Sequence, residues 1–280
     1  MSSSPAQRVR QRFARLASRA DAELDLAETA LLIAAEEYPD LDVAAFLGEL
    51  DDLAMAVEPR LMRLDDPLQQ VGILARFLHE ECGFRGNEDE YYDPRNSFLN
   101  DVMARRVGIP ISLGVVYLEV ARRVGVPLVG VGFPAHFLLR LQSPADLFVD
   151  PYHGGQLLDS DGCRELLAQV SRGKVPFEPR YLEPVSNRQI LVRMLTNLKA
   201  VYFREEEHEK AVAAIDRILL LAPAAHTEVR DRGALYLRME VFRLALADFE
   251  RYLATSPPAE ERPALEEAVV DLRQKVELLN

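Results

Sequence analysis

An internal repeat in the C-terminal third of the chain constrains the fold more than any other feature. Four positions recur with the same or a similar residue 34 positions later: Tyr202, Ala211, Ile215 and Pro223 correspond to Tyr236, Ala245, Phe249 and Pro257. A unit of this length is a helix pair that cannot bury its apolar face alone. The region is therefore expected to fold as stacked helix pairs that cover one another.

A 34-residue period is that of the tetratricopeptide repeat, and Leu198 and Gly233 occupy an apolar and a small-residue position of that pattern. We predict two repeat units, with one helix starting near residue 189 and a last helix over residues 259–279. Many such arrays bind peptides in a concave face, but a two-unit array can also be scaffold. The sequence leaves both alternatives open.

The N-terminal part, residues 7–82, has apolar residues at helical spacing and predicts a small helical bundle. Helices are expected over residues 24–38, 43–57 and 68–78. The breaks between them are expected at Pro39, Pro59 and Pro67. An arginine-rich start precedes an acidic segment over residues 21–66. That segment is either the solvated face of amphipathic helices or a docking surface for a basic partner.

In the middle of the chain the pattern changes from helical to alternating. Helices are predicted over residues 98–107 and about 112–124, with Ser112 as the N-cap of the second. Short strands then follow over residues 129–133, 136–141, 147–150 and 156–158, with a turn at residues 143–146. A loop centred near residue 143 pairs residues whose numbers sum to about 286. His136 would then lie opposite Asp150, within reach of a hydrogen bond.

Composition excludes several classes of function. The net charge of −12 over 280 residues disfavours non-specific binding to nucleic acid or anionic lipid. No stretch is long and apolar enough to span a bilayer, and the N-terminus lacks a secretory signal. Two cysteines make no disulfide framework, which fits a cytoplasmic protein. We expect no cofactor. We also expect no metal, because His79, His208 and His226 lie in helical or linker contexts without ligand spacing, and we interpret His153, beside two glycines, as a turn residue.

Five segments, taken in order, resemble the bacterial SirB-type family: residues 83–87, 91–100, 108–113, 133–138 and 150–155. The resemblance covers nearly the whole chain. It implies an α+β, predominantly helical protein with a transglutaminase/papain-like core that contains a small antiparallel sheet. The expected domains are an N-terminal helical region at 1–82, the core at 83–183 and the tetratricopeptide-like region at 184–280.

The wider transglutaminase and papain-like superfamily uses a Cys, His, Asp triad in that chain order. The resemblance implies that His136 and Asp150 are the second and third members, and that the first lies at residues 110–112. There is no cysteine there, and Ser112 is the only candidate nucleophile. Ser112 is a helix cap, part of a vestigial site that binds a peptide, or a working serine nucleophile. Cys82 and Cys163 are expected to be small buried hydrophobes.

Polar residues near this site are candidates for binding. Tyr92, Asn96 and Asn100 either satisfy backbone groups in irregular structure or line a groove, and Arg140 is a candidate contact for an acidic group. The leading hypothesis is a cytoplasmic, catalytically degenerate transglutaminase-like protein that binds a protein or peptide partner. The alternative is an acyl-transfer or amide-hydrolysing enzyme that uses Ser112, His136 and Asp150. The oligomeric state is not predicted.

Overall fold

The fold combines many helices with one small sheet, as the sequence predicts. The computed structural model describes residues 4–143 and 145–279. Its contacts divide the chain into two compact units, Met1–Met194 (unit 1) and Leu195–Asn280 (unit 2). The sheet lies in unit 1, and helix α8 (Asn187–Arg204) runs across the boundary. The predicted fold class is confirmed.

Unit 1 begins with a run of helices. They are α1 (Pro5–Ala17), η1 (Asp21–Glu23), α2 (Leu26–Ala34), α3 (Val43–Leu61), α4 (Pro67–Arg76) and the π-helical turn η2 (Phe77–Glu81). Asp25, Asp42 and Asp66 start α2, α3 and α4 by accepting backbone N–H groups of the first turn. The prediction that Pro59 ends a helix is wrong. Pro59 lies inside the last turn of α3, where the loss of one backbone hydrogen bond is tolerated because the helix ends two residues later.

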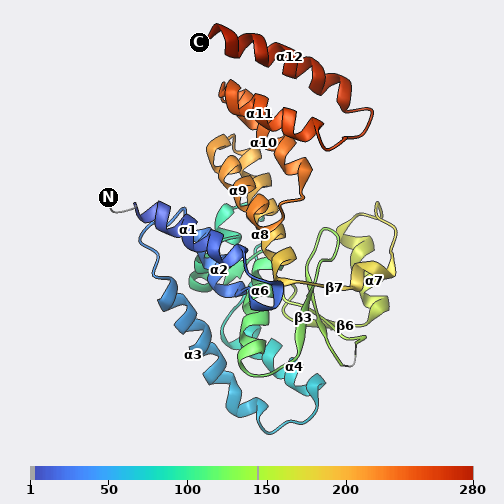
Figure 1. The fold of residues 1–280 in the computed structure, drawn as a ribbon. Helices are drawn as coiled ribbons and strands as arrows, with labels where there is room; N and C mark the ends of the chain where they lie inside the picture. The colour runs from blue at the N-terminus through green and yellow to red at the C-terminus, as the bar shows by residue number, and fades with distance from the viewer. Residues whose placement is uncertain (1–3, 144, 280) are drawn as a thin grey trace. The chain divides into compact units, whose positions relative to one another are not determined.

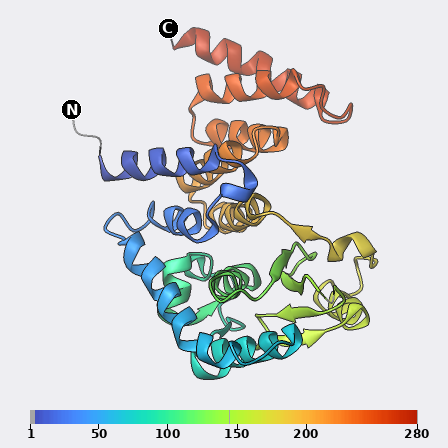
Figure 2. The same ribbon diagram turned by 60° about the horizontal axis from the view of Figure 1, so that its bottom comes forward.

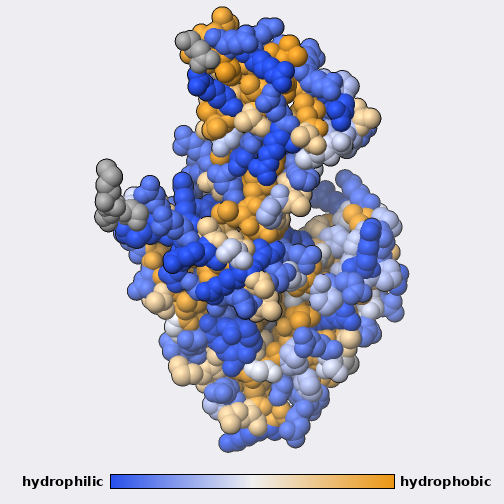
Figure 3. Space-filling view, viewed as in Figure 1, coloured by the Kyte–Doolittle hydropathy of each residue, from blue (hydrophilic) through white to orange (hydrophobic). Residues whose placement is uncertain are grey.

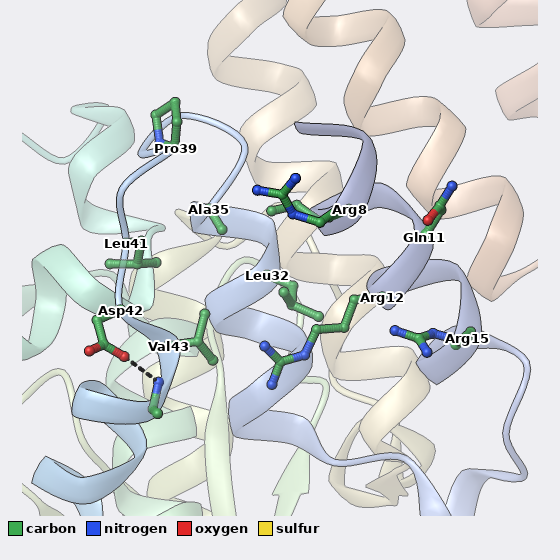
Figure 4. Close-up of a pocket in the computed structure, with 12 residues that line it drawn as sticks. Arg8, Gln11, Arg12, Arg15, Leu32, Ala35, Pro39, Leu41, Asp42 and Val43 are labelled. Atoms are coloured by element: carbon green, nitrogen blue, oxygen red, sulfur yellow. Dashed lines mark hydrogen bonds between the residues drawn. The ribbon is translucent and has the colours of Figure 1, made fainter. Parts of the chain in front are cut away.

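The arginines of α1 neutralise part of the acidic charge that follows them. Arg10 Nε lies 2.9 Å from Glu36 Oε1, and Arg12 Nε lies 2.7 Å from Glu28 Oε1. A groove of about 620 Å³ lies beside α1. Figure 4 shows Arg8, Arg12 and Arg15 among the residues that line it. The acidic segment is thus partly matched by the chain's own arginines, and less of it remains to attract a basic partner.

The sheet of unit 1 has five antiparallel strands in the order β6-β5-β4-β3-β7. These strands are β3 (Leu128–Val131), β4 (Leu138–Leu141), β5 (Phe148–Asp150), β6 (Gln156–Leu158) and β7 (Pro184–Val185). A separate parallel pair joins β1 (Arg85–Gly86) to β2 (Val107–Gly108). The four predicted strands are confirmed. The two-residue strands β1, β2 and β7 are too short to produce an alternating pattern.

The register between β4 and β5 differs from the predicted one by two residues. Leu139 lies opposite Val149 and Arg140 lies opposite Phe148, so paired numbers sum to 288. A shift of two residues leaves every side chain on its predicted face, because side chains alternate with a period of two. His136 itself lies just before β4, outside the paired residues, and its ring reaches Asp150 from there. Pro144, in the predicted turn, lies outside the described residues.

Two helices cover the two faces of the sheet. Figures 1 and 2 show α6 (Pro110–Arg123) on one side and α7 (Ser160–Val170) on the other. Gly114 of α6 lies against Phe137, and a Cβ atom there would stand 2.6 Å from the Phe137 ring. On the opposite face a buried cluster joins the sheet to α7; its members include Val131, Leu138, Phe148, Cys163 and Leu167. The sheet is therefore held between two apolar layers.

Shorter elements complete unit 1. They are η3 (Pro94–Asn96), α5 (Leu99–Arg105) and η4 (Pro179–Leu182). Both η3 and α5 belong to the stretch between β1 and β2, which contains the polar residues singled out in the sequence. The sheet, α6 and this stretch position the candidate site.

Unit 2 repeats its local geometry every 34 residues. Its helices after α8 are α9 (His208–Leu221), α10 (His226–Arg238), α11 (Phe242–Leu253) and α12 (Arg262–Leu278). Glu206 and Glu240 both adopt a positive φ, of 58° and 59°, in the turns after α8 and α10. In both turns the next residue donates its N–H to the carbonyl of the repeated tyrosine, Tyr202 or Tyr236. The repeat is therefore structural as well as sequential.

The surface is largely hydrophilic on the face seen in Figure 3. None of the helices formed by the described residues is long and apolar enough to cross a membrane.

The packing of α10 against α11 predicts the effect of two glycine substitutions. A Cβ at Gly233 would lie 2.8 Å from the Phe249 ring, whereas a Cβ at Gly48 of α3 would meet nothing within 4 Å. Gly233→Ala should therefore lower the free energy of unfolding of unit 2 by about 1–3 kcal/mol. Gly48→Ala should leave stability unchanged or raise it by up to about 1 kcal/mol, because alanine favours helix. Thermal unfolding followed by circular dichroism checks both; equal midpoint shifts would contradict this packing.

Candidate functional site

The buried carboxylate of Asp150, at the end of β5, is the centre of the candidate site. Its Oδ1 accepts the backbone N–H groups of Tyr152 at 3.0 Å and His153 at 3.3 Å. His136 Nε2 lies 2.9 Å from both carboxylate oxygens, and His153 Nδ1 lies 2.7 Å from Oδ2. The structure thus brings His136 and Asp150 together and adds a second imidazole.

These contacts set the charge and the tautomers. Burial by itself would raise the pKa of Asp150, but the hydrogen bonds and charges of His136 and His153 hold that pKa below its ordinary value of 3.8. The carboxylate is therefore ionised at neutral pH and acts only as an acceptor. His136 donates through Nε2–H to the carboxylate, so in its neutral form the lone pair is on Nδ1. His153 donates through Nδ1–H.

His136 is held from the backbone side by Arg193 of α8. It precedes β4 in a loop where Ala135 has a φ of 56°, and its N–H donates to the Phe133 carbonyl. An Arg193 N–H donates to the His136 carbonyl. Burial lowers the pKa of Arg193, an effect that nearby Tyr91 partly offsets. Among the described residues no carboxylate forms an ion pair with Arg193, so a partly buried cation stands beside the site.

A row of aromatic rings leads from the histidines to solvent. Tyr152 meets His136 and His153 edge to face, with ring centroids 5.8 and 5.1 Å apart, and Tyr91 lies 6.3 Å beyond it. Tyr92 follows at 5.3 Å from Tyr91 and is 60% exposed. Burial raises the pKa of Tyr152 to about 12, and its hydroxyl donates to the Asn87 carbonyl. The row offers flat contact area next to the site.

Ser112 is committed to a different set of contacts. Helix α6 has Ile109 as its N-cap, so the prediction that Ser112 is the N-cap is wrong: it is the third residue of the helix. Its fully buried hydroxyl donates to the Asn96 carbonyl at 2.6 Å and accepts the Ile109 N–H at 3.1 Å. Within the described part of the chain no hydrogen bond links Ser112 to His136. The serine joins the start of α6 to the segment before α5.

The predicted binding residues have separate surroundings. The buried amide of Asn96 donates to the carbonyls of Glu90 and Tyr91 and accepts from Asn87, so it satisfies irregular backbone. Asn100 is buried, and its Oδ1 has no hydrogen-bond partner among the described residues. Arg140 donates to the carbonyls of Ala145 and Leu182, and its guanidinium supports the β4–β5 hairpin.

Neither cysteine is activated. Cys163 is fully buried in the cluster under α7, and burial raises the pKa of its thiol to about 12. Cys82 is partly buried at the end of η2, and burial raises the pKa of its thiol as well. A raised pKa reduces the thiolate fraction on which cysteine reactivity depends.

Sequence reasoning assigned His153 to a turn without connecting it with the site, and it did not consider Arg193. His153 lies three residues after Asp150, at a spacing where an aspartate side chain caps the following backbone and can meet the next side chain. Arg193 comes from a distant helix, and no local pattern connects it with His136. His153 also lines a polar groove of about 790 Å³ with Asn87, Tyr152 and Gly154, so solvent reaches the site from that side.

The low pKa of Asp150 predicts a pH-dependent stability. The ionised carboxylate contributes stability that is present above about pH 5 and is lost as pH falls through a folded-state pKa below 3.8. Asp150→Asn should therefore destabilise unit 1 at neutral pH, and the difference from the unmodified protein should shrink on acidification. Urea unfolding at several pH values measures this. Asp161→Asn, at an exposed carboxylate of α7, is the control and should show no such trend.

Comparisons with known proteins identify both parts of the chain. Residues 44–196 match the family model described as Transglutaminase-like superfamily, and residues 198–269 match Tetratricopeptide repeat. A UPF0162 protein of Xylella fastidiosa is 42% identical over 263 residues, which cover 92% of this chain and 93% of the relative.

Two further relatives align over similar lengths. A UPF0162 protein of Pseudomonas aeruginosa is 34% identical over 88% of this chain and 90% of its own length. A UPF0162 protein of Vibrio cholerae is 30% identical over 85% of this chain and 89% of its own length. No solved structure is significantly similar to the chain. The chain therefore belongs to the transglutaminase-like superfamily and, within it, to the UPF0162 family, in agreement with the SirB-type resemblance of its motifs.

Proposed function

We propose that this protein is a catalytically degenerate transglutaminase-like module that binds a protein or peptide segment beside the His136–Asp150 pair. The observation that carries the proposal is the hydroxyl of Ser112. It stands where the family resemblance puts the nucleophile, yet it is fully buried and donates to the Asn96 carbonyl at 2.6 Å.

The chemistry of nucleophilic catalysis explains why this matters. A serine hydroxyl attacks only when an adjacent base takes its proton. A backbone carbonyl accepts a hydrogen bond but is far too weak a base to remove that proton. His136 has the tautomer of a base, with Nε2–H bound to Asp150, but the Ser112 proton points elsewhere. The pair thus retains an oriented imidazole to which no serine or cysteine of the described residues is hydrogen-bonded.

Three features favour a peptide as the bound molecule. The aromatic row that ends at Tyr92 presents flat side chains that lose little conformational entropy on binding. Arg193 offers a cation without an acidic partner among the described residues, which suits a carboxylate or backbone carbonyl. Tetratricopeptide repeats generally mediate protein–protein interactions, and unit 2 contains such repeats. We also propose a cytoplasmic location, because both cysteines are free thiols.

A second candidate function is acyl transfer or amide hydrolysis by Ser112, His136 and Asp150. The tautomer of His136 favours it, since Nδ1 is left as an acceptor. It requires the Ser112 hydroxyl to leave the Asn96 carbonyl and turn toward that nitrogen.

The two candidates predict different results for Ser112→Ala. If Ser112 is structural, the intact protein should not react with a fluorophosphonate probe. Ser112→Ala should cost about 1–3 kcal/mol of stability, because the Asn96 carbonyl loses the hydroxyl donor and the Ile109 N–H keeps only its longer bond of 3.4 Å to that carbonyl. Ser97→Ala is the matched control: Ser97 is also buried, but its hydroxyl makes no hydrogen bond among the described residues. Intact-mass spectrometry and thermal unfolding are the measurements. Covalent labelling that Ser112→Ala abolishes would establish the enzyme instead.

Peptide binding itself is tested with a displayed library of random peptides. The unmodified protein should enrich one sequence motif, and Tyr92→Ala should lower its affinity for that motif by about tenfold or more, as for an aromatic contact residue. Met55→Ala is the control, because Met55 on α3 is equally exposed at 60%. Absence of any enriched motif, or equal effects of the two substitutions, would overturn the proposed binding surface.

A further inference from the structure

His136, Asp150 and His153 form a cluster with the composition of a metal site. One ligand atom from each residue lies within 4.8 Å of the other two. The atoms are His136 Nε2, Asp150 Oδ2 and His153 Nδ1. We propose that this cluster binds a divalent transition-metal ion, with Zn²⁺ as the best fit, and that water completes the coordination.

The distances are close to those that a metal requires. Asp150 Oδ2 lies 2.9 Å from His136 Nε2 and 2.7 Å from His153 Nδ1. A tetrahedral Zn²⁺ with bonds of about 2.0–2.1 Å separates its ligand atoms by about 3.3 Å. The two nitrogen–oxygen distances therefore need to lengthen by only about half an ångström to admit the ion. Two imidazoles and one carboxylate are ligands that Zn²⁺ and related ions accept.

The second imidazole is the feature that a catalytic pair leaves unexplained. One histidine is enough to form a base oriented by Asp150. His153 nevertheless directs Nδ1 at the same carboxylate oxygen, and its ring stacks on that of His136 with centroids 5.5 Å apart. His136 Nε2 and His153 Nδ1 come from two separate segments and both contact Asp150 Oδ2. This arrangement fits a cation-binding site better than a single acid–base pair.

The surroundings fix the carboxylate. Asp150 Oδ1 is occupied by the backbone N–H groups of Tyr152 and His153, so Oδ2 remains for the metal. The Gly155 N–H donates to the Asp150 carbonyl at 2.8 Å, which closes the turn that carries His153. Hydrogen bonds from backbone N–H groups to a ligating carboxylate, such as those of Tyr152 and His153, orient the carboxylate and strengthen metal binding.

The proton balance of binding is simple. In the empty site each imidazole donates a hydrogen bond to Asp150 through the nitrogen that would bind the metal. On binding, that nitrogen gives up its proton and the other nitrogen of the same ring takes one, so each neutral imidazole stays neutral. The metal accepts the freed lone pairs, and the carboxylate exchanges two hydrogen bonds for one metal bond.

A path leads to the cluster from solvent. The side chain of His153 is 36% exposed and lines the polar groove of about 790 Å³. The acidic residues Glu88, Asp89 and Glu90 line the same groove. Their negative charge raises the local concentration of cations at its mouth.

The test uses the full chain, freed of metal with a chelator and titrated with Zn²⁺ by calorimetry and with Co²⁺ by visible absorption. We expect one site with a dissociation constant on the order of micromolar or tighter. Co²⁺ should give the absorption band of a low-coordinate nitrogen and oxygen site. His153→Gln should weaken binding by at least about tenfold, as loss of one ligand does.

Controls separate this site from adventitious binding. His79→Gln removes a histidine of the same groove whose Nδ1 donates to the Phe84 carbonyl, and it should leave affinity unchanged. Because His153 is partly exposed, His153→Gln should fold normally, and circular dichroism checks this. Asp150→Asn removes a second proposed ligand and should also weaken binding. Binding weaker than about 100 µM, or affinity unaffected by both His153→Gln and Asp150→Asn, would overturn the proposal.

Discussion

The burial of the Asp150 carboxylate is the constraint on which the candidate site depends. An ionised carboxylate in the interior is costly unless hydrogen bonds replace its water. Asp150 obtains them from two backbone N–H groups and two imidazoles. These bonds tie the end of β5, the turn after it and the loop before β4 to one point. Tyr152 is placed by the same turn, so the aromatic row also follows from this carboxylate.

A second network of hydrogen bonds engages Asn96 and Ser112. Asn96 is fully buried; its side chain satisfies the irregular backbone near Glu90, and its carbonyl receives the Ser112 hydroxyl. The serine is thus used to join the start of α6 to the preceding segment. The oriented imidazole and the hydroxyl engaged by the Asn96 carbonyl are the two observations behind the proposed binding role. The proposed metal site depends only on the first network, so the two proposals can fail separately.

Sequence reasoning succeeded where the signal is periodic. The helix pairs of unit 2 follow from a 34-residue repeat. The hydrogen bond between His136 and Asp150 agrees with the predicted approach of their segments, although His136 lies in the loop before β4. The register was missed by two residues because the centre of a hairpin loop is not fixed by its sequence. The alternation survived that error, since a shift of two keeps each residue on its face.

Other features could not be predicted from local patterns. Pro110, at the first position of α6, indicates a helix start two residues before Ser112, and the preference of serine for N-caps pointed the other way. The contact of Arg193 with His136 joins residues 57 positions apart and has no periodic signal. The role of His153 depends on how the chain turns after Asp150, which the adjacent glycines permit but do not specify.

The most direct test of this account is nitrogen-15 NMR of the histidine side chains in metal-free protein at neutral pH. The account predicts that His136 carries its proton on Nε2 and His153 on Nδ1, each hydrogen-bonded to Asp150 and protected from exchange with water. Protonation of His136 on Nδ1, or rapid averaging of the two tautomers in both rings, would contradict it, because the carboxylate would then not organise the site.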